Sequence, residues 1–173
     1  LARFLGRRGG VPVEEAAAAY AAHLAWRRGP GNPARLLQAA RAVPHGFVRA
    51  AGSARDGSRI VLVQGARYDP AVAAEEYVLA CAYAMDVAAP PGLVGTVTIL
   101  IDVRPGEGWV NAAAARMVPF FRALCKSLPD HYPERVERLI VFPVNAVFSY
   151  FWSMVSGLLD KSLCGACVTL SGR

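Results

Sequence analysis

The segment DHYPERVERLIVFP, residues 130–143, gives the strongest indication of the fold. Its first half is polar and contains Pro133, whereas residues 138–142 are almost entirely aliphatic and aromatic. Side chains of this kind after a proline-containing turn predict a β-strand over residues 138–142. Pro143 ends that strand or places it at an edge, because proline has no N–H to donate to a neighbouring strand.

No charged residue occurs from Leu139 to Leu159, and a run of that length could cross a bilayer as a helix. Two features argue against a membrane span. Pro143 and Asn145 divide the run, and residues 146–159 carry a stripe of serines at helical spacing. We therefore predict a strand followed by an amphipathic helix, whose apolar face holds Val147, Phe151, Met154 and Leu158.

Strands and helices alternate along the rest of the chain. Further strands are predicted over residues 59–64, 95–102 and 166–170, and helices over 13–28, 33–43 and about 110–128. Asp69 and Pro70 suit the cap and first position of another helix, which runs to about Met85. This order predicts an α/β fold with a mixed, largely parallel sheet of about four to five strands, behind a helical N-terminal lobe.

Composition sets the class of protein. The chain has 173 residues, 54% of them hydrophobic and 18% charged, which fits one globular domain and excludes a disordered chain. The net charge is +6, and residues 1–60 hold ten arginines against three acids. This basic half predicts an anionic membrane surface as partner, although solvated helix faces would explain it equally well. Four scattered cysteines favour a reducing compartment.

Catalytic and nucleic-acid motifs are weak. Residues 104–111, RPGEGWVN, follow a strand but match neither nucleotide-binding loop pattern. Cys164 and Cys167 form a CxxC pair, which leaves a redox enzyme as an alternative, but two packed strand cysteines explain the pair more simply. The three histidines lack the spacing of metal ligands, and the strands lack interleaved basic and aromatic residues. We expect no enzyme, no metal and no nucleic-acid partner.

Four segments, in order, resemble the CRAL-TRIO lipid-binding domains, which include cellular retinaldehyde-binding protein, α-tocopherol transfer protein and fungal phosphatidylinositol/phosphatidylcholine transfer proteins. They are LARFLGRR (1–8), DGSRIVLVQGARYDP (56–70), VTILIDVRPGEGW (97–109) and HYPERVERLIVFPVNAVFSYFWSMVSGLLD (131–160). The resemblance implies a helical N-terminal lobe over residues 1–45. It also implies a lipid-binding domain over 46–173, incomplete at its C-terminal end. The sheet would floor a hydrophobic pocket, closed by a helical gate at about residues 147–159.

The resemblance also implies which side chains contact the lipid. A two-chain lipid has about thirty methylenes, and exposing them to water costs over ~20 kcal/mol, so many apolar side chains must cover them. The candidates are Val97, Ile99, Ile101, Phe120, Phe121, Leu124, Val147, Phe148, Phe151, Trp152, Met154, Val155 and Leu158. Taken singly, each of them is better explained as ordinary core, and the prediction depends on the set as a whole.

A headgroup site is implied at Arg8 and Glu134, with a surface ion pair to Arg135 or Arg138 as the alternative role of Glu134. Two departures from the family argue against phosphatidylinositol. Ala166 stands where a lysine is usual, and FPVN (142–145) replaces the usual Asn-x-Pro. Because Val97 and Ile99 occupy positions that carry hydroxyls in phosphatidylcholine carriers, a sterol-like or isoprenoid ligand would also fit.

We therefore expect a non-catalytic protein that binds one phospholipid or other lipophile and transfers or presents it between membranes. We expect no cofactor, and the bound lipid is the only ligand that we expect. A cytoplasmic monomer, peripherally attached to membranes and active in phosphatidylinositol transfer or a related exchange, fits this prediction. The alternative is a lipid-sensing or protein-interaction module of a larger regulatory protein.

Overall fold

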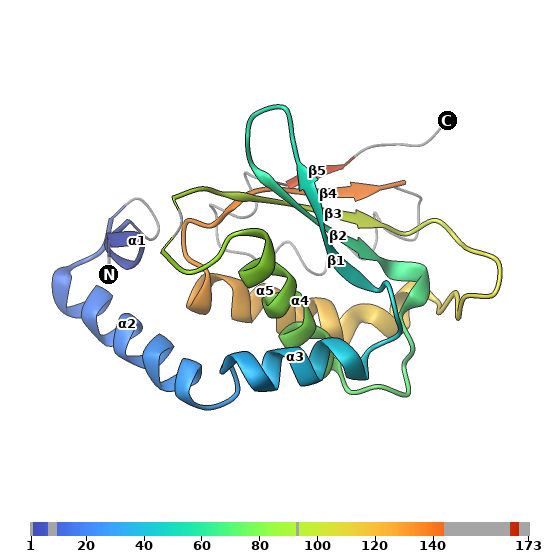
Figure 1. Ribbon diagram of the computed structural model, residues 1–173, viewed down its shortest axis with the longest axis horizontal. Helices are drawn as coiled ribbons and strands as arrows, with labels where there is room; N and C mark the ends of the chain where they lie inside the picture. Colours follow the sequence, from blue (N-terminus) through green and yellow to red (C-terminus); the bar gives the residue numbers. More distant parts are fainter. Residues whose placement is uncertain (1, 7–9, 93, 144–166, 170–173) are drawn as a thin grey trace.

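The computed structural model describes residues 2–6, 10–92, 94–143 and 167–169. Three helices come first along the chain: α1 (Ala2–Leu5), α2 (Val13–Arg28) and α3 (Pro33–Ala42). Asn32 begins α3 by accepting a hydrogen bond from the Arg35 N–H, and Pro33 occupies the first helical position. The helix α2 lies at one end of the molecule (Figure 1), and among its residues only Ala16 is fully buried.

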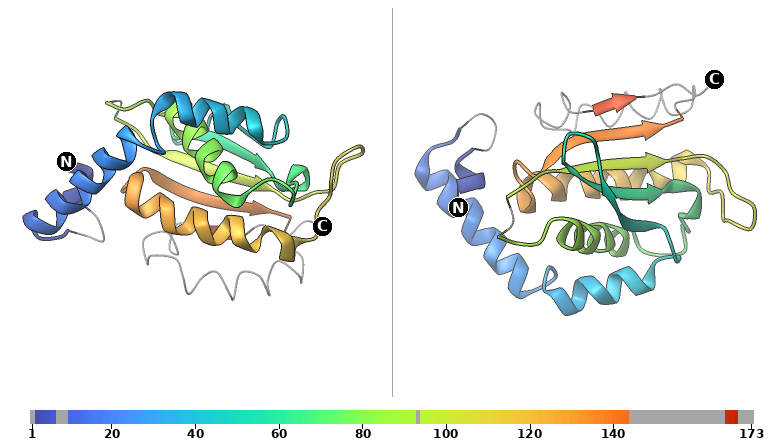
Figure 2. Two further views of the ribbon diagram at one scale, coloured as in Figure 1. Left: turned by 90° about the horizontal axis from the view of Figure 1, so that it is seen from below. Right: turned by 45° about the horizontal axis from the view of Figure 1, so that its top comes forward.

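A five-stranded sheet forms the centre of the molecule, and its strands lie in chain order. The hairpin of β1 and β2 is antiparallel, and every other pair is parallel. Helices α4 and α5 are the crossovers between parallel strands, and Figure 2 shows them together on one face of the sheet. The strands are β1 (Val48–Ser53), β2 (Arg59–Gln64), β3 (Val97–Asp102), β4 (Val136–Phe142) and β5 (Cys167–Thr169), and the helices are α4 (Ala74–Ala88) and α5 (Val118–His131).

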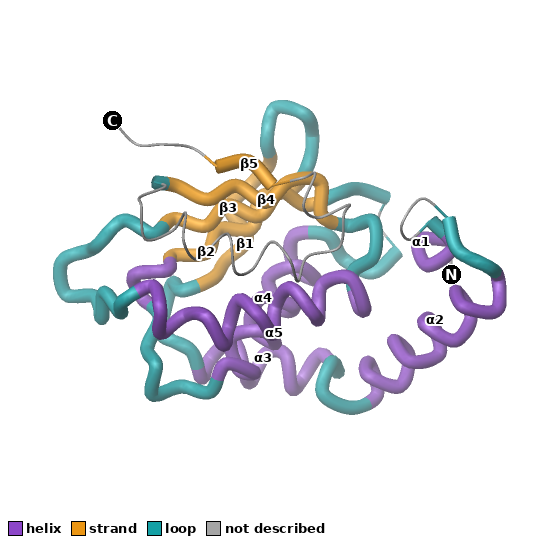
Figure 3. The backbone as a smooth tube through the Cα atoms, turned by 180° about the vertical axis from the view of Figure 1, so that it is seen from behind, coloured by secondary structure: helices purple, strands orange, loops and turns teal. Residues whose placement is uncertain are grey.

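The main core lies between the sheet and these helices. Strand register aligns Val61, Ile99 and Leu139 across three strands, and all three are buried in one hydrophobic cluster with residues of α4 and α5. Figure 3 shows the helices against this face from behind. Tyr77 of α4 and Phe120 of α5 are fully buried there, with ring centroids 5.8 Å apart. Aliphatic strands therefore pack on an aromatic helix layer.

The fold class predicted from the sequence is confirmed, with local differences. Helix α2 and strand β2 have the predicted bounds. Strand β1 was not predicted, since its sequence, VRAAGS, lacks the β-branched alternation of a typical strand. Helix α4 begins at Ala74 rather than at Pro70, because Asp69 instead accepts a hydrogen bond from the Ala71 N–H and closes a turn.

The part of the chain that the structure describes contains no helix long and apolar enough to cross a membrane. The gate predicted over residues 147–159 lies outside the described residues, as does Cys164.

Candidate functional site

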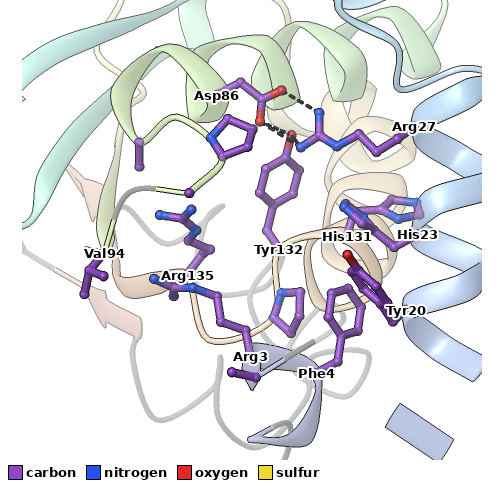
Figure 4. Close-up of a pocket in the computed structure, with 15 residues that line it drawn as sticks. Arg3, Phe4, Tyr20, His23, Arg27, Asp86, Val94, His131, Tyr132 and Arg135 are labelled. Atoms are coloured by element: carbon purple, nitrogen blue, oxygen red, sulfur yellow. Dashed lines mark hydrogen bonds and ion pairs between the residues drawn. The ribbon is translucent and has the colours of Figure 1, made fainter. Parts of the chain in front are cut away.

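Two adjoining cavities lie where α1 and α2 meet the C-terminal ends of α4 and α5. The first, of about 380 Å³, is called the basic cavity and is drawn in Figure 4. The second, of about 490 Å³, is called the apolar groove and is lined mainly by α2, α3 and α4. They share Tyr20, His23, Arg27, Asp86 and Pro91 in their linings. A ligand or a surface that reaches one cavity therefore also comes close to the other.

The wall between the cavities is a charged network of three side chains. Arg27, in the last turn of α2, donates two hydrogen bonds to the carboxylate of Asp86 near the end of α4, at 2.5 and 2.9 Å. The hydroxyl of Tyr132, which directly follows α5, lies 3.0 Å from Asp86 Oδ1. Burial raises the pKa of Tyr132, so its hydroxyl remains protonated and can donate to the carboxylate. This network joins three helices at the site.

Two further arginines that line the basic cavity converge on one backbone oxygen. Arg3 Nη2 and Arg135 Nη1 donate to the carbonyl oxygen of Gly95, at 3.0 and 3.1 Å. Among the described residues that line the cavity, Asp86 is the only acid, and Arg27 neutralises it. Burial and the charge of Arg3 lower the pKa of Arg135, as expected for neighbouring cations. The cavity thus carries two positive charges without a carboxylate partner among those lining residues.

A cluster of histidines and aromatic rings forms the contact between α2 and α5. The His131 ring stacks on Trp26 with centroids 4.0 Å apart, and it lies 5.8 Å from the His23 ring. The Nδ1 atoms of both histidines are buried without a hydrogen-bond partner. Burial and the proximity of His23 lower the pKa of His131 to about 4. Burial and the charge of Arg27 also lower the pKa of His23, so both rings are neutral near pH 7.

Because of this cluster, we expect the protein to become less stable in mild acid. The pKa of His131 is lower in the folded protein, about 4, than its usual 6.5, so the unfolded chain binds more protons between those values. We expect the free energy of unfolding to fall by about 2 kcal/mol as pH drops through this window, after allowing for partial solvent exposure of the ring. Urea titrations at pH 7 and 4.5 measure the loss.

The control for this prediction is His131→Phe, which can keep a stacked ring on Trp26 but cannot bind a proton. We expect it to reduce the acid-induced loss by more than half. His45→Phe, at an exposed position, should leave the loss unchanged. Equal losses in wild type and His131→Phe would contradict this account.

Only part of the predicted lipid-contacting set lies in the described residues. Val97, Ile99 and Ile101 of β3 and Phe120, Phe121 and Leu124 of α5 are all buried, and all six belong to the single core cluster. The structure thus brings them together between the sheet and its helices, and their contact with lipid stays a prediction. Val147, Phe148, Phe151, Trp152, Met154, Val155 and Leu158 lie outside the described residues.

Of the two predicted headgroup residues, the structure describes only Glu134, which does not line the basic cavity. Arg8 lies outside the described residues, and Glu134 is exposed in a left-handed turn with φ 53°. The carbonyl oxygen of Glu134 instead accepts a hydrogen bond from Arg3 at 2.6 Å. Sequence reasoning missed Arg3 and Arg135, although each is close to a residue it selected. Their convergence on Gly95 has no signal in the sequence.

Within the described residues, no group of histidine, cysteine and acidic side chains could hold a metal ion. Burial raises the pKa of Cys81 to about 12, so this thiol is not a ready nucleophile.

Comparison with known proteins identifies the family. The family model of the CRAL/TRIO domain matches residues 45–171. The chain belongs to the CRAL/TRIO domain family. The crystal structure of Sfh5 shares the fold of this CRAL/TRIO chain, with a TM-score of 0.64 and 12% sequence identity. The match covers 91% of this chain and 59% of that one, so the CRAL/TRIO chain described here spans about three fifths of the length of Sfh5. No curated protein matches it.

These comparisons confirm the CRAL-TRIO resemblance and support lipid binding or transfer in general terms.

Proposed function

We propose that this CRAL/TRIO chain binds one lipid with an anionic headgroup and transfers or presents it between membranes, without catalysis. The observation that carries the proposal is the pair of arginines, Arg3 and Arg135, on the Gly95 carbonyl. Guanidinium groups suit phosphate because they donate paired hydrogen bonds in a fixed geometry. A phosphate in the basic cavity would supply the negative charge that the described lining residues lack. Phospholipids are therefore the favoured class of ligand.

The apolar part of the ligand is proposed to contact Val97, Ile99 and Ile101, which requires it to enter between the sheet and helices α4 and α5, where these side chains are buried. Val94 lines the basic cavity and precedes β3 by three positions, so the cavity lies at the beginning of the strand that carries these side chains. The apolar segment 147–159 is proposed to be the gate over the chains. Such a protein would be cytoplasmic and would associate peripherally with membranes. Residues 1–45 would form the helical lobe, and residues 46–173 the lipid-binding part.

The direct test is mass spectrometry of lipids that the purified protein retains after incubation with mixed vesicles. A single phospholipid class near one-to-one would support the proposal. A retained sterol or isoprenoid, without phosphate, would refute the role of the arginines but keep lipid binding. No retained lipid after incubation would overturn the proposed function and favour a protein-interaction module.

Substitution of the paired arginines separates the headgroup from the chains. We expect Arg3→Gln and Arg135→Gln each to weaken retention of phosphate-bearing lipid at least about tenfold, the equivalent of about 1.4 kcal/mol. Titration of the protein with a fluorescent phospholipid measures the change. Arg122→Gln is the matched control, because Arg122 is exposed on α5 and does not line the cavity. Similar affinity in all three variants would show that the headgroup binds elsewhere.

A further inference from the structure

Exposed apolar side chains gather around the two cavities. The structure leaves five large hydrophobic residues exposed in its described part, and three of them, Leu24, Val87 and Val94, line the basic cavity or the apolar groove. Val94 is 93% exposed and Val87 is 52% exposed. Isolated exposed apolar residues are common, but several around one opening mark an interaction surface.

Part of this exposed apolar surface lies on the loop between α4 and β3. Pro90, Pro91 and Gly92 are all exposed, and the prolines restrict the backbone while offering no N–H groups that need partners. Gly92 has φ 94°, and a Cβ at this position would meet no atom within 4 Å. The loop therefore extends into solvent and carries Val94 beside the opening of the basic cavity (Figure 4).

The positive charge of the same surface indicates what kind of partner it binds. Both linings together contain Arg3, Arg27 and Arg135 but, within the described residues, Asp86 as the only acid. Since Arg27 pairs with Asp86, the surplus is positive. Basic groups close to an anionic bilayer surface contribute about 1 kcal/mol each, and apolar side chains at the rim add burial in the headgroup region. Apolar side chains around a positive cavity thus complement a bilayer of anionic lipids.

We propose that the rim formed by Leu24, Val87, residues 89–92 and residues 94–95 is the surface through which this protein docks on a bilayer containing anionic phospholipid. The inference rests on the proposed function, since the basic cavity then opens onto the membrane that supplies its lipid. On docking, the side chains of Val87 and Val94 enter the boundary between the headgroups and the acyl chains. Arg3 and Arg135 then lie at the level of the lipid phosphates.

The test is sedimentation of the protein with vesicles of phosphatidylcholine alone or with about 30 mol% phosphatidylserine. We expect wild type to bind the anionic vesicles at least about tenfold better. Val87→Gln combined with Val94→Gln should lower that partition coefficient at least about tenfold, because both side chains leave the bilayer interface. The matched control is Val110→Gln, at a valine also 52% exposed but on the loop at the opposite end of the molecule (Figure 1). It should bind within about twofold of wild type.

Two outcomes would overturn the docking surface. One is binding of the double variant within about twofold of wild type. The other is an equal loss in Val110→Gln, which would show a general effect of surface polarity. If gel filtration showed instead that the double variant loses self-association while vesicle binding is unchanged, the rim would be a contact between copies of the chain. Circular dichroism verifies that each variant is folded.

Lipid retention, measured on the same proteins, separates this inference from the proposed function. If docking alone fails, the variants still carry lipid and vesicle binding does not depend on the rim. If the proposed function fails, wild type retains no lipid, yet the rim variants still lose vesicle binding. The two failures therefore give different results.

Discussion

Phe120→Ala is expected to destabilise the protein by about 4 kcal/mol, the largest effect of any single substitution considered. Phe120 is completely buried, and its ring lies 5.5 Å from Phe47 and 5.8 Å from Tyr77, centroid to centroid. Truncation removes a large apolar side chain and leaves a cavity that close-packed neighbours fill only in part. Urea unfolding of lipid-free protein measures the change in free energy.

The same variant tests whether Phe120 belongs to the core or to a lipid pocket. A residue that only lines lipid would lose ligand affinity on truncation, with little change in the stability of the lipid-free protein. Phe142→Ala is the control, because this half-buried phenylalanine lies on the opposite face of the sheet and should cost about 1–2 kcal/mol. Equal, small losses in both variants would place Phe120 in the pocket rather than in the core.

Arg27→Ala is expected to cost about 3 kcal/mol, because it removes the partner of a largely buried carboxylate. The side chains of Arg27 and Asp86 are only 20% and 19% exposed, so Asp86 would keep a charge that water solvates poorly. The substitution also removes the guanidinium that lies 4.9 Å from the Trp26 ring centroid. Thermal or urea unfolding at pH 7 measures the loss, and faster amide exchange in α2 would accompany it.

Arg138→Ala provides a matched comparison at a more exposed ion pair. Arg138 also binds an aspartate, Asp56, but the two side chains are 50% and 32% exposed. Surface pairs contribute little, so we expect a loss below about 1 kcal/mol. If the two arginine variants lost the same stability, the network at Arg27 would not be what stabilises the packing of α2 on the rest of the protein.

Much of the fold follows from local patterns in the sequence. Residues 59–64 combine aliphatic side chains with flanking polar residues, and β2 has these bounds. The acidic first turn of α2, with Glu14 and Glu15, and its basic last turn agree with the helix dipole. Periodicity failed for α2 in one respect. Val13 and Leu24 are hydrophobic and share one face of the helix, a pattern typical of a buried face, yet both are exposed.

The site was harder to predict because its residues come from distant parts of the chain. Arg3 and Gly95 are separated by 92 positions, and Arg27 and Asp86 by 59. A charge pattern shows that residues 1–60 are basic, but it cannot show which arginines lose their counter-ions when helices meet. The predicted Glu134 and the observed Arg135 are neighbours, and the turn between α5 and β4 decides which of them faces the cavity.

The order of the strands in the sheet bears on how the protein is made. Strands β1 to β5 lie side by side in the order of the sequence, so each new strand pairs with the one synthesised immediately before it. No strand has to be inserted between two that have already paired. The sheet can therefore grow from one edge as the chain leaves the ribosome, and the edge that is unpaired at each stage pairs with the next strand to be synthesised.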